Sequence, residues 1–346
     1  MTDNAPVIAR IEGRAGRLTL NKPKALHALD RDMCEIMTNA LVGWANDDAV
    51  DLVIVDHAEG TRGFCAGGDI KLLSDSGKKD GVEGRAFFAE EYRLNTLIHN
   101  YKKPYISFLD GVTMGGGVGI SVHGSHRIAT PNTTFAMPES GIGLFPDVGG
   151  GWFLPRLDGE LGMWLALTGA RLKGEDVLAA GVATHFAPAD SLEALKSKLS
   201  TEGVGALEGL QTSAKGGFEQ YRAIIDSCFS KDSVEEIIAA LEADGSEWAN
   251  KQLAALATKS PTTMKVALRQ LRAGGQMKTF EDNMRMEYRI GSRIVVSHDF
   301  IEGVRAVVVE KDNAPKWSPA ELSGVTEAAL DAIFAPVDEE LTFLDV

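Results

Sequence analysis

The sequence predicts an α/β fold in the first half of the chain and a helical region in the second half. Three observations lead to this prediction: short apolar runs alternate with amphipathic helices, glycine clusters follow the predicted strands, and helical spacing dominates from about Gly159 onward. The 346 residues correspond to about two domains by length alone. With 44% hydrophobic and 24% charged residues, the chain can bury a large core and is not expected to be disordered.

The first half is predicted to alternate strand, loop and helix. Residues 30–46 illustrate the helical signal, because their apolar side chains recur at i, i+3, i+4, i+7, i+8 and i+11 and so share one face. Strands are predicted where apolar and polar residues alternate, or where a short apolar run stands between loops. In chain order the predicted elements are a β-hairpin over 7–12 and 17–21, the helix over 30–46, a strand over 52–56, a short helix over 70–73, a helix over 86–101 that Pro104 ends, strands over 104–109 and 127–130, and short helices over 118–122 and 148–154.

The second half contains helical patterns and almost no candidate strands. Breaks at Pro261 and at Gly274-Gly275 separate neighbouring helices. A loose, glycine-rich stretch over 202–217 is typical of a hinge or linker. The predicted helices cover 233–242, 246–258, 262–271, 281–297 and 299–309.

Composition excludes several classes of protein. A formal net charge of −14 argues against nucleic acid as a partner, because that binding depends on neutralising phosphates. No apolar run approaches the roughly 20 residues that span a bilayer, so no membrane association is expected. The first residues do not resemble a signal peptide, and we therefore expect a cytoplasmic protein. Three scattered cysteines fit neither a disulfide framework nor a metal site: Cys34, Cys65 and Cys228.

The 37 glycines are about 11% of the chain, against a typical ~7%. They do not form a phosphate-binding loop, since no Lys-Ser/Thr pair follows a cluster, and no G-x-G-x-x-G or G-x-S-x-G pattern is present. One alternative is tight packing and turns. The other is an oxyanion hole, in which Gly68 and Gly116, each before a short predicted helix, donate bare N–H groups to a carbonyl oxygen that gains charge.

Three strings resemble the crotonase (enoyl-CoA hydratase/isomerase) superfamily. They are Arg62-Gly-Phe-Cys-Ala-Gly-Gly-Asp-Ile70, Gly111-Val-Thr-Met-Gly-Gly-Gly-Val-Gly119 and Phe135-Ala-Met-Pro-Glu139. The continuation from Ser140 through Gly151, the later strings over 286–289 and 298–306, and Pro315-Lys316-Trp317 are most similar to its 3-hydroxyisobutyryl-CoA hydrolase subfamily. The resemblance covers essentially the whole chain.

The resemblance implies a crotonase-like spiral of ββα units over residues 1–200, which contains the CoA site and the oxyanion hole. It also implies a helical C-terminal region over residues 201–346 that completes the active site. It places the thioester carbonyl between the N–H groups of Gly68 and Gly116. The substrate is then an acyl-CoA, with no separate cofactor and no metal, and with a homo-oligomer (trimer or hexamer) as an open alternative to a monomer. It also implies that Lys24 or Lys71 meets a CoA phosphate, unless these lysines are merely solvated. The CoA-binding residues implied are Lys24, Ala25, Ala66, Gly68, Asp69 and Ile70.

The acids distinguish two chemistries within the superfamily. Hydratases use two glutamates, and one of these positions is here Gly119, which has no side chain. The resemblance to the hydrolase subfamily assigns catalysis to Glu139 and Asp147, and substrate contacts to Glu91, Gly116, Glu139 and Asp147. Glu139 then attacks the thioester carbonyl or activates water, while Asp147 holds the substrate hydroxyl, shifts the pKa of Glu139 or handles protons.

We therefore expect hydrolysis of a short-chain 3-hydroxyacyl-CoA, most specifically of 3-hydroxyisobutyryl-CoA in valine breakdown. An enoyl-CoA hydratase or isomerase and a non-catalytic CoA-binding scaffold are the alternatives. Taken alone, Glu91 suits a solvated helix face, and Asp147 suits an N-cap for the helix over 148–154. His123 and His126 lack a third candidate ligand and are expected to be structural, as is Cys65.

Overall fold

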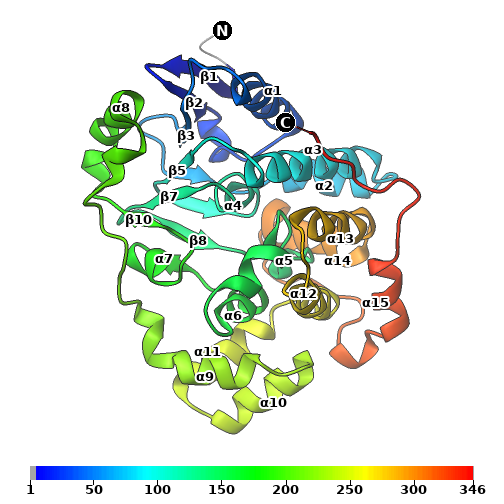
Figure 1. The fold of residues 1–346 in the computed structure, drawn as a ribbon. Helices are drawn as coiled ribbons and strands as arrows, with labels where there is room; N and C mark the ends of the chain where they lie inside the picture. Colours follow the sequence, from blue (N-terminus) through cyan, green and yellow to red (C-terminus); the bar gives the residue numbers. More distant parts are fainter. Residues whose placement is uncertain (1–4, 346) are drawn as a thin grey trace.

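The structure is a computed structural model that describes residues 5–345, and its two β-sheets are surrounded by helices (Figure 1). The larger sheet has six strands in the order β1-β2-β3-β5-β7-β10, and the smaller sheet has four in the order β4-β6-β8-β9. The α/β prediction is confirmed. The strands are β1 Val7–Glu12, β2 Ala15–Leu20, β3 Leu52–His57, β4 Gly63–Cys65, β5 Tyr105–Leu109, β6 Val112–Met114, β7 His126–Ala129, β8 Thr134–Ala136, β9 Leu172–Lys173 and β10 His185–Phe186.

Successive strands pass alternately to the two sheets. The first strand of each pair (β3, β5, β7) joins the larger sheet, and the second (β4, β6, β8) joins the smaller one. Within each sheet these strands run parallel. Because the carboxyl ends of parallel strands meet at one edge of a sheet, the loops after β4 and β6 come together. These loops carry the first two glycine clusters, so the fold itself brings Gly68 and Gly116 side by side.

The helices of the first half begin close to their predicted positions. In α1 (Arg31–Ala45), Asp30 is the N-cap and accepts a hydrogen bond from the N–H of Met33. The predicted helix over 86–101 is α3 (Val82–His99), which starts four residues earlier and ends before Pro104. The other predicted helices are α2 Ile70–Gly77, α4 Gly116–Gly119 and α5 Gly150–Phe153. Three further helices had no individual prediction: α6 Leu161–Thr168, α7 Glu175–Ala179 and α8 Leu192–Glu202.

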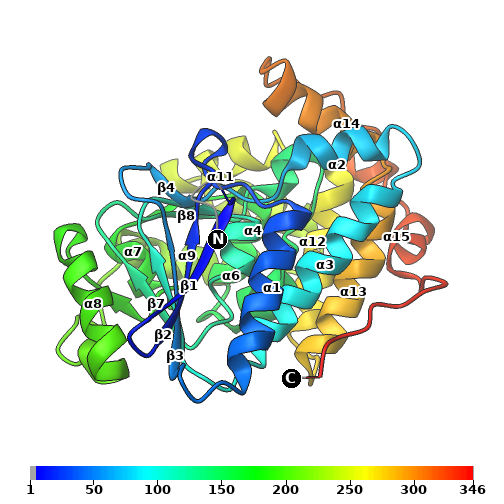
Figure 2. The same ribbon diagram turned by 90° about the horizontal axis from the view of Figure 1, so that it is seen from above.

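The C-terminal helices close over the first half of the chain. Figure 2 shows α13 (Phe280–Ile294) lying beside α3, and the two helices are in extensive contact. One hydrophobic core contains buried side chains from Val7 to Leu341, and it therefore spans both predicted regions. The boundary at residue 200 stays a prediction. The remaining helices are α9 Arg222–Phe229, α10 Val234–Asp244, α11 Glu247–Leu256, α12 Pro261–Gly274, α14 His298–Val304 and α15 Glu327–Phe334.

One predicted helix is α-helical only in its first part. The helix over 299–309 begins as α14 but continues as a π-helical turn over Arg305–Val309. Lys311 and Asn313 then adopt left-handed backbone conformations, with φ of 59° and 52°. This irregular segment matters because Val307, Val308, Asn313 and Pro315 reach the cavity described next.

Candidate active site

The two glycine loops present two N–H groups to one place. Gly68 directly precedes α2, and Gly116 is the first residue of α4. A Cβ added to Gly116 would lie 3.2 Å from the Gly68 nitrogen, so the two backbones approach as closely as glycine permits. Among residues 5–345, neither N–H group donates to another backbone carbonyl. The loops therefore have the arrangement that an oxyanion hole requires.

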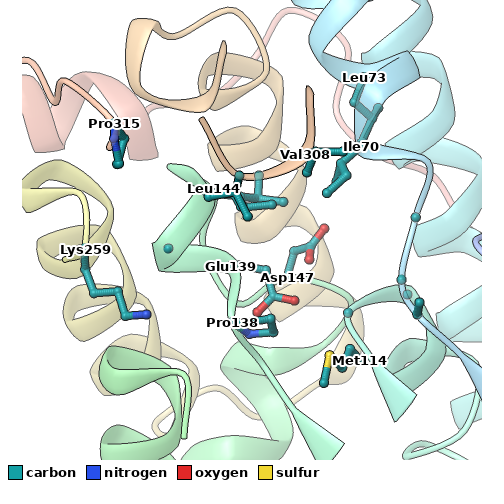
Figure 3. Close-up of a pocket in the computed structure, with 18 of the residues that line it drawn as sticks. Ile70, Leu73, Met114, Pro138, Glu139, Leu144, Asp147, Lys259, Val308 and Pro315 are labelled. Atoms are coloured by element: carbon teal, nitrogen blue, oxygen red, sulfur yellow. The ribbon is translucent and has the colours of Figure 1, made fainter. Parts of the chain in front are cut away.

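A cavity of about 470 Å³ opens beside these glycines, and Figure 3 shows part of its lining. Its wall is largely apolar and includes Ile70, Leu73 and Leu144. The carboxyl groups of Glu139 and Asp147 point into it next to each other, and Lys259 enters from another side. An apolar cavity with a few converging polar groups is the usual form of a small-molecule site.

Glu139 stands at the turn that follows β8. It begins a short 3-10 helix over Glu139–Ile142, and only 5% of its surface is exposed. Burial raises the pKa of Glu139 well above its usual value, the charge of Asp147 adds to this, and Lys259 opposes it. Its Oε2 atom is buried without a hydrogen-bond partner among the described residues. This oxygen is therefore free to act on a bound molecule.

Asp147 lies beside Glu139, and a tyrosine holds its carboxylate. The hydroxyl of Tyr92 donates a hydrogen bond of 2.9 Å to Asp147 Oδ2. Burial raises the pKa of Asp147 to about 7, and the Tyr92 hydrogen bond opposes the shift. The reading of Asp147 as an N-cap is wrong, because Gly149 is the N-cap of α5 and the Asp147 carboxylate turns into the cavity instead.

Glu91 is a third carboxyl group at the same place. It lies on α3, is 2% exposed, and its Oε1 atom would be 2.5 Å from a Cβ added to Gly116. The interpretation of Glu91 as part of a solvated helix face is therefore wrong. Burial raises the pKa of Glu91 well above its usual value, and the charges of Asp147 and Glu139 reinforce this shift. Three acids and the glycine pair thus share one cavity.

The position predicted for a hydratase glutamate has no room for a side chain. A Cβ added to Gly119 would lie 2.6 Å from Val148 Cβ and 2.8 Å from Asn95 Nδ2. Real Cβ atoms do not approach other heavy atoms this closely, so a glutamate at this position would displace Val148, the neighbour of Asp147. The Asp147 loop occupies the space that a second catalytic glutamate would need.

The predicted CoA-binding residues divide into two groups. Ala66, Gly68 and Ile70 line the cavity, whereas Lys24, Ala25 and Asp69 lie outside its lining. Lys24 and Ala25 belong to a short 3-10 helix over Pro23–Ala25. Sequence reasoning missed two cations of the lining, Arg171 and Lys259. Each is a single basic residue in a segment without a motif, so no pattern marked it. The role of the six predicted residues in CoA binding stays a prediction.

The histidines and Cys65 have structural surroundings. His123 Nε2 is 2.7 Å from the carbonyl oxygen of Val148, and its ring packs against Phe280 at 4.7 Å. Cys65 is buried and donates to the carbonyl of His27. Within residues 5–345, no three His, Cys, Asp or Glu side chains are arranged to hold a metal ion. The expectation that the protein needs no metal stays a prediction.

Replacing Asp147 with asparagine is expected to stabilise the protein at pH 8 and much less at pH 5. Folding raises the pKa of Asp147 from 3.8 to about 7. The folded protein therefore loses stability relative to the unfolded chain as the pH rises through this range, because the unfolded chain gives up the proton more easily. Asparagine avoids this cost and still accepts the Tyr92 hydrogen bond. The gain in unfolding free energy should grow by about 2–3 kcal/mol between pH 5 and pH 8, measured by denaturant titration. A gain independent of pH would contradict the raised pKa.

Comparison with known proteins is consistent with this geometry. The Enoyl-CoA hydratase/isomerase family matches residues 15–334. Curated relatives named "3-hydroxyisobutyryl-CoA hydrolase, mitochondrial" include one from Danio rerio, 48% identical over 94% of this chain and 88% of its own, and one from Homo sapiens, 46% identical over 95% and 88%.

Two solved structures show the same fold over almost the whole chain. A protein from Mycobacterium thermoresistibile, titled a carnitinyl-CoA dehydratase, is 44% identical with a TM-score of 0.93 over 98% of both chains. An enoyl-CoA hydratase from Rhodobacter sphaeroides is 37% identical with a TM-score of 0.92, over 98% of this chain and 100% of that one. The predicted crotonase-like fold with a helical C-terminal region is confirmed.

The names of these relatives do not support one expectation from the sequence. The curated relatives are described as mitochondrial, and the cytoplasmic location expected for this chain stays a prediction. Within residues 5–345, no helix combines the length and the apolar character needed to cross a bilayer. The family match and the identities of the relatives agree over most of the sequence. This chain belongs to the enoyl-CoA hydratase/isomerase family.

Proposed function

We propose that this protein hydrolyses the thioester of a short-chain 3-hydroxyacyl-CoA, with 3-hydroxyisobutyryl-CoA as the substrate. One observation carries the proposal: Glu139 and Asp147 line the same cavity as Gly68 and Gly116, while the space beside Gly119 is filled by Val148. The site therefore has an acid pair and an oxyanion hole but lacks the second glutamate of a hydratase. The names of the curated relatives support the same reaction and substrate.

The arrangement supplies each requirement of thioester hydrolysis. With the carbonyl oxygen between the N–H groups of Gly68 and Gly116, Glu139 attacks the carbonyl carbon, the C–S bond breaks, and a mixed anhydride forms that water then opens. In the alternative, Glu139 takes a proton from water, which attacks directly. Both routes give the free acid and CoA, and the geometry of the site is compatible with either.

Asp147 is suited to proton transfer. Two carboxyl groups that repel each other in a buried cavity do not both ionise easily, so near neutral pH one of the pair retains a proton. The ionised member serves as nucleophile or base, and the protonated member supplies the proton that the departing CoA thiolate needs. Glu91, at the edge of the oxyanion hole, is placed to bind the polar part of the acyl group.

The substrate and the reaction class are tested together with a panel of acyl-CoA thioesters. Free CoA, followed with a thiol reagent, is expected to appear fastest with 3-hydroxyisobutyryl-CoA, and the enoyl absorbance of crotonyl-CoA is expected to persist. Steady loss of that absorbance without CoA release would instead support a hydratase. The two similar solved structures are named as a dehydratase and a hydratase. Tight binding of CoA without turnover of any thioester would support a non-catalytic scaffold.

A further inference from the structure

A fourth buried acid, Glu287, lies behind the site and does not reach the cavity. It belongs to α13, is fully buried, and is 138 residues from the loop that it contacts. The N–H of Gly149 donates to Glu287 Oε2 at 2.7 Å, and the N–H of Gly151 donates to Oε1 at 2.9 Å. Glu287 therefore binds the backbone immediately after Asp147.

Two amide side chains complete the surroundings of Glu287. Asn283 Nδ2 donates to Oε1 at 2.8 Å, and Gln270 Nε2 donates to the same oxygen at 3.1 Å. All four partners are N–H donors, and among the described residues no Lys or Arg forms an ion pair with this acid. Burial raises the pKa of Glu287 to about 8 and the charge of Asp147 adds to this, whereas the hydrogen bonds from these N–H donors oppose the shift.

Gln270 connects Glu287 to the other side of Asp147. Its Nε2 atom also donates to the carbonyl of Pro146 at 2.8 Å. The residues before and after Asp147 are thus held by one network from α12 and α13. Between these two attachments Val148 adopts φ of +50°, a conformation that a β-branched residue adopts only when its surroundings impose it.

We propose that Glu287 is a positioning residue for the reaction: by binding the N–H groups of Gly149 and Gly151, it fixes the loop that aims the Asp147 carboxylate at the substrate. The C-terminal helices then contribute to catalysis through this acid. Glutamine at position 287 has nearly the same volume but turns an NH2 group toward one of the two backbone N–H donors. The loop then loses one attachment, and Asp147 is aimed less accurately.

The test compares Glu287→Gln, Asp147→Asn and the double variant in the full-length protein with 3-hydroxyisobutyryl-CoA. This inference rests on the proposed hydrolase activity. We expect Glu287→Gln to lower kcat by about 10- to 100-fold with KM changed less than about threefold. In the Asp147→Asn background the same substitution should change kcat by no more than about twofold, because the group that Glu287 positions is already absent.

Two outcomes would overturn the inference: an unchanged kcat in Glu287→Gln, or an equally large loss in the Asp147→Asn background. Leu241→Ala is the control for lost stability, because Leu241 is a buried residue of α10. This variant should keep the wild-type kcat when it is assayed well below the melting temperature of the variant.

If Glu287→Gln does not fold, Gln270→Met is tested instead, because it removes one hydrogen bond to Glu287 and the hydrogen bond to Pro146. A wild-type kcat in Gln270→Met would also contradict the inference. An inactive wild type would refute the proposed function, whereas an active wild type with an unaffected Glu287→Gln would refute only this inference.

Discussion

Replacing Glu139 with glutamine is expected to lower kcat for CoA release by about 10³-fold or more, with a small change in KM. The amide keeps the shape of the side chain but neither attacks a carbonyl nor takes a proton from water. The measurement is steady-state release of free CoA from 3-hydroxyisobutyryl-CoA, together with the melting temperature of the variant. Because Glu139 Oε2 has no hydrogen-bond partner among the described residues, the substitution is not expected to destabilise the fold.

Glu90→Gln is the matched control for Glu139→Gln. Glu90 is also a glutamate near the site, on α3 beside Glu91, but it is partly exposed and pairs with Arg93 at 3.1 Å. Its substitution should leave kcat unchanged within about twofold. If Glu139→Gln retained more than about a tenth of the wild-type kcat, Glu139 would be excluded as nucleophile or base.

The second large effect is expected from Gly116→Ala. A Cβ at this position would lie 2.5 Å from Glu91 Oε1 and 3.2 Å from the Gly68 nitrogen, so it would occupy the place of the substrate oxygen and push Glu91 away. Loss of an oxyanion donor typically lowers kcat by about 10²- to 10³-fold, and we expect at least that decrease. CoA release and the melting temperature are measured for the variant and the wild type.

Gly43→Ala is the matched control, because the added methyl group makes no close contact with other residues. Gly43 lies within α1, and no atom is within 4 Å of an added Cβ. This change should leave kcat unaltered and raise the unfolding free energy by about 0.5–1 kcal/mol, since alanine is the better helix former. A Gly116→Ala variant that folds and keeps the wild-type kcat would show that the carbonyl oxygen is bound elsewhere.

The sequence located residues that line the cavity, but it missed several elements of the secondary structure around them. The hairpin and the long amphipathic helices were found because their periodicity is strong. The strands β4, β6 and β8 were missed because three residues are too few to show alternation. The helix α6 has no polar face at all, since all eight of its residues are buried, and so it shows no amphipathic period.

The limits of sequence reasoning are clearest for residues that act across the fold. Glu139, Asp147 and Glu91 were identified through a family resemblance, and the structure brings all three into one cavity. Glu287 stood in a string that was part of the same resemblance, but nothing local to α13 indicated that its carboxylate binds the Asp147 loop. Such a contact depends on the packing of distant segments, which periodicity does not reveal.

The central claim is that water is added at the thioester carbonyl, and oxygen-18 labelling tests it most directly. The wild-type enzyme is incubated with 3-hydroxyisobutyryl-CoA in ¹⁸O-water, and the products are identified by mass spectrometry. The account predicts free CoA together with 3-hydroxyisobutyrate that carries ¹⁸O in its carboxylate after repeated turnover. Label in the 3-hydroxyl group of an acyl-CoA that retains its CoA would show reversible hydration instead, and would contradict the account.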